Sequence, residues 1–169
     1  MVSEIRGVKC TKSLTCQLGV VALPPLSFSL SNIPHLASFS YCQRHVPFLD
    51  DSSAALDLER VYSFLDVKAP MKRLQIMNLE FQCHKTDVHI TTVHPAVISQ
   101  WKQFDSLLAG PDYASLRKIN LEVLIVLILE YSDEIDSQWL VESVKRQLGL
   151  CFEHLGRSKA EFRIVVDVD

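Results

Sequence analysis

One spacing of three large apolar residues recurs along the chain. The second residue lies three positions after the first, and the third lies two positions after the second. In a strand the second and third of these residues face the same side, while the first lies at the bend that enters the strand. Short segments rich in β-branched and aromatic residues favour strands. The spacing therefore predicts a strand at each occurrence, and residues 162–168 predict a further strand by strict alternation. The occurrences are Leu23-Leu26-Phe28, Leu36-Phe39-Tyr41, Met71-Leu74-Ile76 and Leu116-Ile119-Leu121.

Between these segments lie stretches in which apolar residues recur every three or four positions, the period of a helix that packs one side on a sheet. Capping residues and helix breakers bound them. The expected helices run from residue 51 or 52 to Pro70, from Pro95 to the Gly-Pro pair at 110–111, and from residue 136 or 137 to Gly156. Their apolar stripes are Ala54, Leu58, Val61 and Leu65; Val97, Trp101, Phe104 and Leu108; and Leu140, Val144, Leu148, Cys151 and Leu155.

The resulting order, strand and helix in alternation from Leu36 onward, predicts parallel strands joined by right-handed crossovers. The apolar run over residues 121–129 agrees, because parallel strands are commonly buried on both faces; at about nine residues it is too short for a membrane span, which needs about 20. Two α/β architectures satisfy the order: an irregular solenoid in which each strand pairs with its sequence neighbours, or a compact open parallel sheet of the doubly wound kind. The leucine at strand entries favours the solenoid.

Three segments within residues 23–169 carry a resemblance to a known family. They are Asn32-Ile33-Pro34-His35-Leu36, Trp101-Lys102-Gln103-Phe104-Asp105 with Leu107-Leu108, and Tyr113-Ala114-Ser115-Leu116-Arg117-Lys118-Ile119. These segments resemble the leucine-rich-repeat-like part of fungal F-box proteins. We therefore expect a single leucine-rich-repeat-like α/β domain over 23–169, preceded by an irregular or disordered segment, residues 1–22.

The resemblance implies a non-catalytic protein-interaction module, similar to the substrate-recognition half of an F-box protein. No F-box-like helical segment is found at the N-terminus, so binding of the ubiquitin-ligase adaptor is expected only if an F-box is supplied elsewhere. The chain also departs from ordinary repeats of 20–29 residues. The strand entries at Leu36, Met71 and Leu116 lie 35 and 45 residues apart, and no Asn or Cys ladder follows the strands.

The net charge and the cysteine content limit which classes of partner and which cellular compartment are expected. The net charge of −3 gives no reason to expect nucleic acid or a membrane surface as a partner. Five cysteines without a paired spacing indicate free thiols in a reducing compartment, so we expect an intracellular protein, cytoplasmic or nuclear. The alternative is an N-terminal signal segment, in which basic residues precede the apolar stretch 14–23.

No residue set carries a recognisable reaction, so we assign no catalytic, cofactor-binding or metal-binding residue. The five glycines do not cluster as a phosphate-binding loop requires. Cys83, His84, His89 and His94 lack the spacing of zinc ligands. Cys42 lies near His45, but no nucleophile signature surrounds it. The acidic residues at 133, 134 and 136 are explained by favourable charge at a helix N-terminus.

Two alternatives to an interaction module stay open: a small α/β enzyme, and a degenerate remnant without activity. An enzyme site would lie at the carboxyl ends of the strands, over residues 42–45, 83–85 and 131–134. Of the two tryptophans, Trp101 lies on an apolar stripe and is expected in the core. Trp139 lies off its stripe and is the candidate for an exposed partner-binding side chain.

Overall fold

A computed structural model of the chain describes residues 13–18, 30, 33, 35–47, 53–67, 69–85, 93–127 and 137–168. Five strands form one parallel sheet whose order follows the sequence, β1-β2-β3-β4-β5. The elements are β1 Ser13–Leu18, β2 Ser38–Pro47, α1 Ser53–Leu65, β3 Ile76–Lys85, α2 Pro95–Leu108, the 3-10 helix η2 Pro111–Tyr113, β4 Lys118–Leu127, α3 Ser137–Gly149, α4 Glu153–Gly156 and β5 Glu161–Val168.

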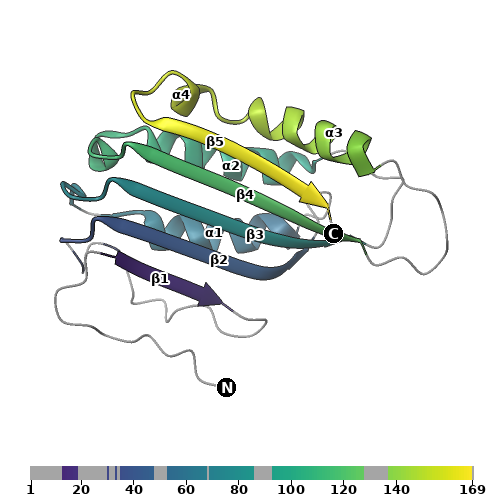
Figure 1. The fold of residues 1–169 in the computed structure, drawn as a ribbon, viewed down its shortest axis with the longest axis horizontal. Coiled ribbons are helices and arrows are strands. Elements are labelled where there is room, and N and C mark those ends of the chain that lie inside the picture. Colours follow the sequence, from purple (N-terminus) through teal and green to yellow (C-terminus); the bar gives the residue numbers. More distant parts are fainter. Residues whose placement is uncertain are drawn as a thin grey trace.

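The described helices pack on one side of this sheet. Figure 1 shows α1 and α2 behind the strands, with α3 and α4 along β5. Buried side chains of all four helices join one hydrophobic core with the strands. Right-handed crossovers that always advance in the same direction place their helices on the same face. The compact open parallel sheet therefore fits the structure, whereas doubly wound packing, with helices on both faces, is not seen among the described elements.

A buried leucine precedes each of three strands in the same local structure. The backbone N–H of Leu36, Leu74 and Leu116 donates to the carbonyl three residues earlier, at 3.1, 3.1 and 2.9 Å. The residue after each leucine then continues the pairing between strands: Gln75 N–H donates to the carbonyl of residue 37, and Arg117 N–H to that of Gln75, both at 2.9 Å. This turn fixes where each strand begins and which of its residues face the helices.

The structure corrects the register predicted for β3. Leu74 is fully buried, but Ile76 is 40% exposed and lies on the side of the sheet away from the helices. The equivalent of Leu36-Phe39-Tyr41 is Leu74-Met77-Leu79, shifted by three residues from the predicted triplet. In-register positions 39, 77, 119 and 162 are separated by 38, 42 and 43 residues, a more even spacing than the predicted 35 and 45.

Other elements differ from the expectation in detail. The third helix was expected to run through Cys151 and Leu155, but α3 ends at Gly149 and α4 follows as a separate turn. The exposed Glu122 and half-buried Leu124 of β4 show that this strand is buried on one face only, not on both as its apolar run indicated. β1 falls within residues 1–22, and the rest of that segment, like the strand predicted at 23–28, lies outside the described residues.

A chain of aromatic rings connects β2 to β5 through the core. Neighbouring ring centroids are separated by 6.0 Å between Tyr41 and Phe81, 5.3 Å between Phe81 and Trp101, and 5.7 Å between Trp101 and Phe152. Phe162 of β5 is the last ring of this series, and its centroid lies 4.9 Å from that of Phe152. Trp101 thus lies fully buried at its centre, as the apolar stripe predicted. None of the described helices has the length and apolar character needed to cross a membrane.

A buried carboxylate on α2 holds the start of α4. Asp105 is 2% exposed and accepts hydrogen bonds from the backbone N–H groups of His154 and Leu155, at 2.9 and 2.8 Å. His154 Nδ1 lies 2.6 Å from the same carboxylate. These backbone donors belong to the first turn of α4 and have no acceptor within that helix, so Asp105 serves as their cap from another helix.

We expect Leu74→Ala to lower the free energy of unfolding by about 2–5 kcal/mol, because it leaves a cavity in the core. Ile76→Ala, two residues away, should cost about 1 kcal/mol or less, since its side chain is largely solvated. Urea denaturation of both variants measures the difference. Equal losses at the two positions would contradict the corrected register.

We expect Asp105→Ala to destabilise the protein by roughly 2–3 kcal/mol, because a buried and a partly buried backbone N–H donor both lose a charged acceptor. Ser106→Ala, at the exposed neighbouring position, is the matched control and should change stability by about 0.5 kcal/mol at most. His154→Ala should cost no more than about 1 kcal/mol, since its imidazole is largely exposed. A loss in His154→Ala as large as in Asp105→Ala would show that the side-chain pair, rather than the cap, provides the stability.

Candidate functional site

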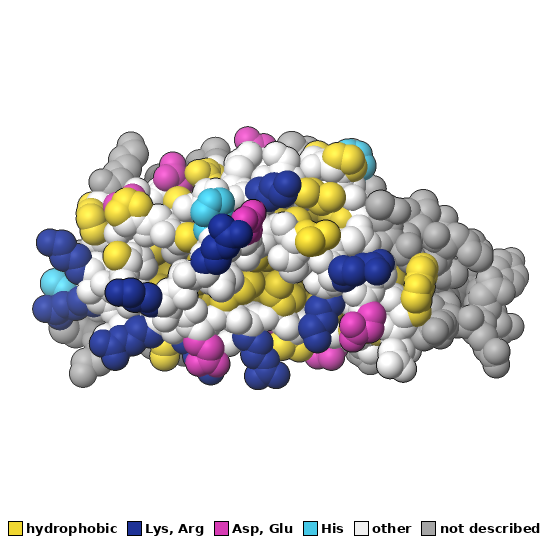
Figure 2. Space-filling view, turned by 90° about the horizontal axis from the view of Figure 1, so that it is seen from above, with side chains coloured by type: hydrophobic (Ala, Val, Ile, Leu, Met, Phe, Trp, Pro, Cys, Tyr) yellow, Lys and Arg dark blue, Asp and Glu magenta, His cyan; other side chains and the backbone are white. Residues whose placement is uncertain are grey.

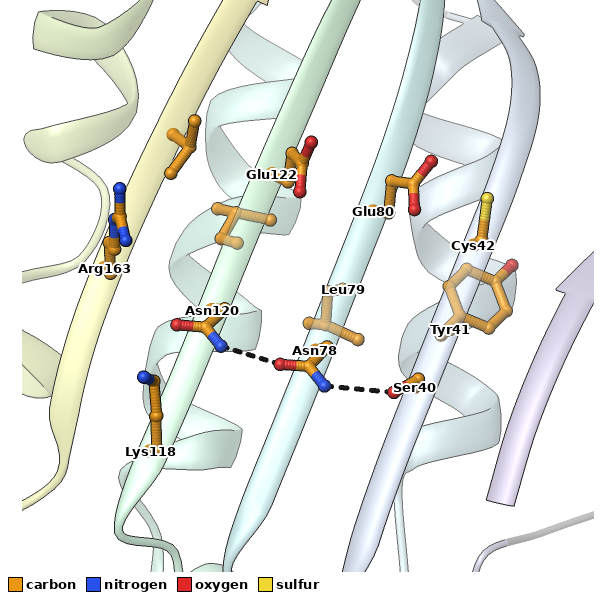
Figure 3. Close-up of a pocket in the computed structure, with 12 residues that line it drawn as sticks. Ser40, Tyr41, Cys42, Asn78, Leu79, Glu80, Lys118, Asn120, Glu122 and Arg163 are labelled. Carbon is orange, nitrogen blue, oxygen red and sulfur yellow. Dashed lines mark hydrogen bonds between the residues drawn. The ribbon is translucent and has the colours of Figure 1, made fainter. Parts of the chain in front are cut away.

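The face of the sheet turned away from the helices carries the candidate site, and we call it the open face. Its central row consists of Ser40, Asn78, Asn120 and Arg163, which are partners in register on β2 to β5. Asn120 Nδ2 donates to Asn78 Oδ1 at 2.7 Å, and Asn78 Nδ2 donates to Ser40 Oγ at 3.0 Å. Both amides therefore point the same way across the strands (Figure 3). Such side-chain ladders stabilise neighbouring strands.

The next row places two carboxylates side by side. Cys42, Glu80 and Glu122 are register partners, two residues further along β2, β3 and β4. Figure 3 shows the carboxylates of Glu80 and Glu122 on the same side of the sheet as the ladder. Like charges directly opposite one another on neighbouring strands are destabilising. This row is therefore an unfavourable arrangement for the isolated fold, and a bound cationic group would relieve it.

Basic side chains lie on the other side of the ladder and at its β5 end. Lys118 precedes Asn120 by two residues on β4, and its Nζ lies 3.9 Å from Glu161 on β5. Arg163 is exposed beside Asn120. The Lys118–Glu161 contact is long and both side chains are solvent-exposed, so it contributes little to stability. The charged groups on the open face are thus separated along the strands, with Lys118 before the ladder and the carboxylate pair after it.

A hollow of about 460 Å³ follows these rows across β2, β3, β4 and β5. Ladder, carboxylates and basic side chains all line it, together with the thiol of Cys42. This volume is in the range of small-ligand sites, but such sites are mainly apolar and enclose their ligand. The hollow instead lies on the face of a sheet, and its lining combines polar side chains with the apolar Leu79, Leu121 and Val165, a mixture that can contact an extended chain.

The thiol of Cys42 is held in its neutral form. Burial raises its pKa, and a hydrogen bond to Glu80 together with the negative charge of that carboxylate raises it further, against an opposing effect of Arg44. Cys83 faces the core, where burial raises its pKa to about 12. A nucleophilic cysteine requires a lowered pKa, so neither environment activates its thiol.

The residues considered for metal binding or catalysis are not brought together in the described structure. Cys83 and His84 are consecutive in β3, so they face opposite sides of the sheet. His94 lies at the start of α2, where its Nδ1 accepts a hydrogen bond from the N–H of Ala96 at 3.2 Å. His89, the imidazole of His45 and the acidic residues at 133–136 lie outside the described part. The described residues contain no group of three metal-binding side chains.

Trp139, the candidate for partner binding, is 54% exposed at the start of α3. Its position off the apolar stripe predicted this exposure, and its role in binding stays a prediction. Figure 2 views the molecule from above, toward β5, α3 and α4, and shows hydrophobic side chains exposed between basic and acidic ones. Phe162 and Ile164 of β5 are only half-buried, so the core is less covered at this end than in the middle of the sheet.

Sequence reasoning missed the open face, although a repeated motif marks it. Asn-Leu-Glu occurs at Asn78-Leu79-Glu80 and again at Asn120-Leu121-Glu122, each time between two apolar residues. The repeat places an amide and a carboxylate on the same face of neighbouring strands, with the leucine buried between them. Comparisons with family models, curated proteins and solved structures found no match.

We expect Cys42 to react slowly with iodoacetamide at neutral pH and faster as the pH rises, because the thiolate is the reactive form. Glu80→Gln should accelerate the reaction, since removing a nearby negative charge lowers the thiol pKa and increases the thiolate fraction. Glu142→Gln, on the exposed face of α3, is the control. Peptide-level mass spectrometry follows Cys42 alone, and an unchanged rate in Glu80→Gln would show that the carboxylate does not govern this thiol.

Proposed function

We propose that this chain is a non-catalytic protein-interaction module that binds its partner on the open face of the sheet. The observation that supports this function most directly is that the described helices cover only one face of the sheet. All-parallel sheets occur almost only with both faces covered, yet every described helix packs on the same face here. The face that no described helix covers carries hydrogen-bonding and charged side chains, which suit a polar protein surface or peptide.

The architecture that we propose is an irregular leucine-rich-repeat-like solenoid. Three features support it: the strand order follows the sequence, a leucine turn precedes three of the strands, and in-register positions recur after 38, 42 and 43 residues. In a solenoid each repeat contacts mainly its neighbours, and the stacked strands provide an extended binding surface. The Ser40-Asn78-Asn120 ladder crosses three such repeats and would fix their relative register on that surface.

The resemblance to F-box proteins suggests a specific context for this module. Within that family the repeat-like part recognises the protein to be ubiquitinated, and we propose the same role for the open face. Contact with the ubiquitin-ligase adaptor would then require an F-box supplied by another segment or another chain. A hydrolytic enzyme is the competing function, and the neutral thiol of Cys42 argues against the nucleophile considered for it.

We expect Asn120→Arg to abolish partner capture, because a long cationic side chain would fill the middle of the hollow. Gln103→Arg, which adds the same side chain at an exposed position of α2, should leave capture unchanged. Tagged proteins expressed in the source cells, photo-crosslinked and identified by mass spectrometry, provide the measurement. Thermal unfolding verifies that both variants fold.

Two results would contradict this function. One is a set of captured proteins that is identical for wild type and Asn120→Arg. The other is turnover in a hydrolase screen that disappears when Glu80 or Glu122 is replaced by glutamine, since a catalytic carboxylate pair would then explain the row that we assign to partner binding.

A further inference from the structure

The charges on the open face are arranged along the strand direction. On β4, Lys118 stands two residues before the ladder residue Asn120, and Glu122 stands two residues after it. Arg163 lies at the β5 end of the ladder, and Glu80 lies beside Glu122 (Figure 3). A ligand that crosses the ladder along β4 therefore passes from a basic region to an acidic one.

Of the two regions, the acidic one restricts more strongly which ligand can bind. Glu80 and Glu122 are in register on neighbouring strands, so their Cα atoms are separated by about 5 Å and their negative charges repel. A guanidinium or ammonium group between them would donate hydrogen bonds to both carboxylates, and hydrogen bonds between charged groups are the stronger kind. The same carboxylates disfavour phosphate groups, and this makes a nucleic acid or an anionic membrane a poor occupant.

Other charged groups on this face modify the pattern without reversing it. Arg44 lies close enough to Cys42 to affect its thiol, and it therefore offsets part of the acidic region on the β2 side. Asp167 of β5, in register with Leu124, adds negative charge beyond the carboxylate pair. Glu161 offsets part of the charge of Lys118. The acidic region keeps more negative than positive groups, and Lys118 with Arg163 outnumber Glu161 in the basic one.

Building on the proposed function, we propose that the open face binds an extended peptide segment of a partner protein that carries one basic and one acidic side chain. The basic side chain lies between Glu80 and Glu122, and the acidic one contacts Lys118 and Arg163. The peptide backbone crosses the ladder between them. Lys118 and Glu122 are four residues apart on β4, about 13 Å in a strand, so the two peptide side chains stand about four positions apart.

The test selects short random peptides displayed on phage against immobilised wild-type protein and measures synthetic copies by fluorescence anisotropy. Selected peptides should pair Lys or Arg with Asp or Glu at about four positions' separation. Binding should weaken about tenfold or more in the Glu80→Gln/Glu122→Gln double variant, and it should weaken as the salt concentration rises. Glu122→Gln alone, at an exposed position, is the second variant should the double variant fold poorly. Glu142→Gln on α3 is the matched control and should bind as wild type.

The variants separate failure of this inference from failure of the proposed function. Peptides that lose binding to Asn120→Arg but bind Glu80→Gln/Glu122→Gln as tightly as wild type would refute the charge assignment and leave the open face as the binding surface. Selection that yields no peptide sensitive to Asn120→Arg would overturn both proposals. If the wild type self-associates and Asn120→Arg abolishes this, a second copy of the chain is the occupant. That result would also overturn the proposal that a peptide binds the open face.

Discussion

Burial of the sheet on one side is the constraint on which the rest of this structure depends. Each strand joins the previous one on the same edge, so right-handed crossovers from β2 to β5 deliver their described helices to the same face. One layer of helices must then supply the whole core, and the leucine turns hold the strands in the register that points Phe39, Met77 and Ile119 toward it. The opposite face carries the polar row Ser40, Asn78 and Asn120, whose side chains pair with one another across the strands.

The order of strands and helices was predictable because apolar residues follow periods of two and 3.6 along the chain. The register of β3 was not. Both Met71-Leu74-Ile76 and Leu74-Met77-Leu79 satisfy the same spacing, and local sequence does not distinguish them. The choice is made by tertiary structure, since pairing with β2 places Met77 opposite Phe39 and Leu79 opposite Tyr41. The repeat length is therefore ambiguous when it is measured between predicted strand entries. It is unambiguous when it is measured between residues paired on neighbouring strands.

The open face was missed for a different reason. The strands were expected to be buried on both faces, and an enzyme site was therefore expected at their carboxyl ends. The polar residues of the open face lie instead in the middle of the strands. The apolar residues on either side of them keep the mean hydropathy of each strand segment high, so the polar positions do not stand out. The repeated Asn-Leu-Glu could have revealed them, because the same three residues at equivalent strand positions 42 residues apart imply one shared environment. The hydrogen bonds between the two amides required knowledge of which strands are neighbours.

The chain of aromatic rings bears on how such a protein loses its structure. In an ideal repeat array the ends can fray while the middle persists, because each unit contacts only its neighbours. Here Trp101 of α2 contacts both Phe81 of β3 and Phe152, whose ring in turn contacts β5. Detaching the last strand would therefore expose the centre of the core rather than a terminal layer. The protein should melt from β2 to β5 as one cooperative unit, and the fluorescence of Trp101 would report the loss of the whole domain at once.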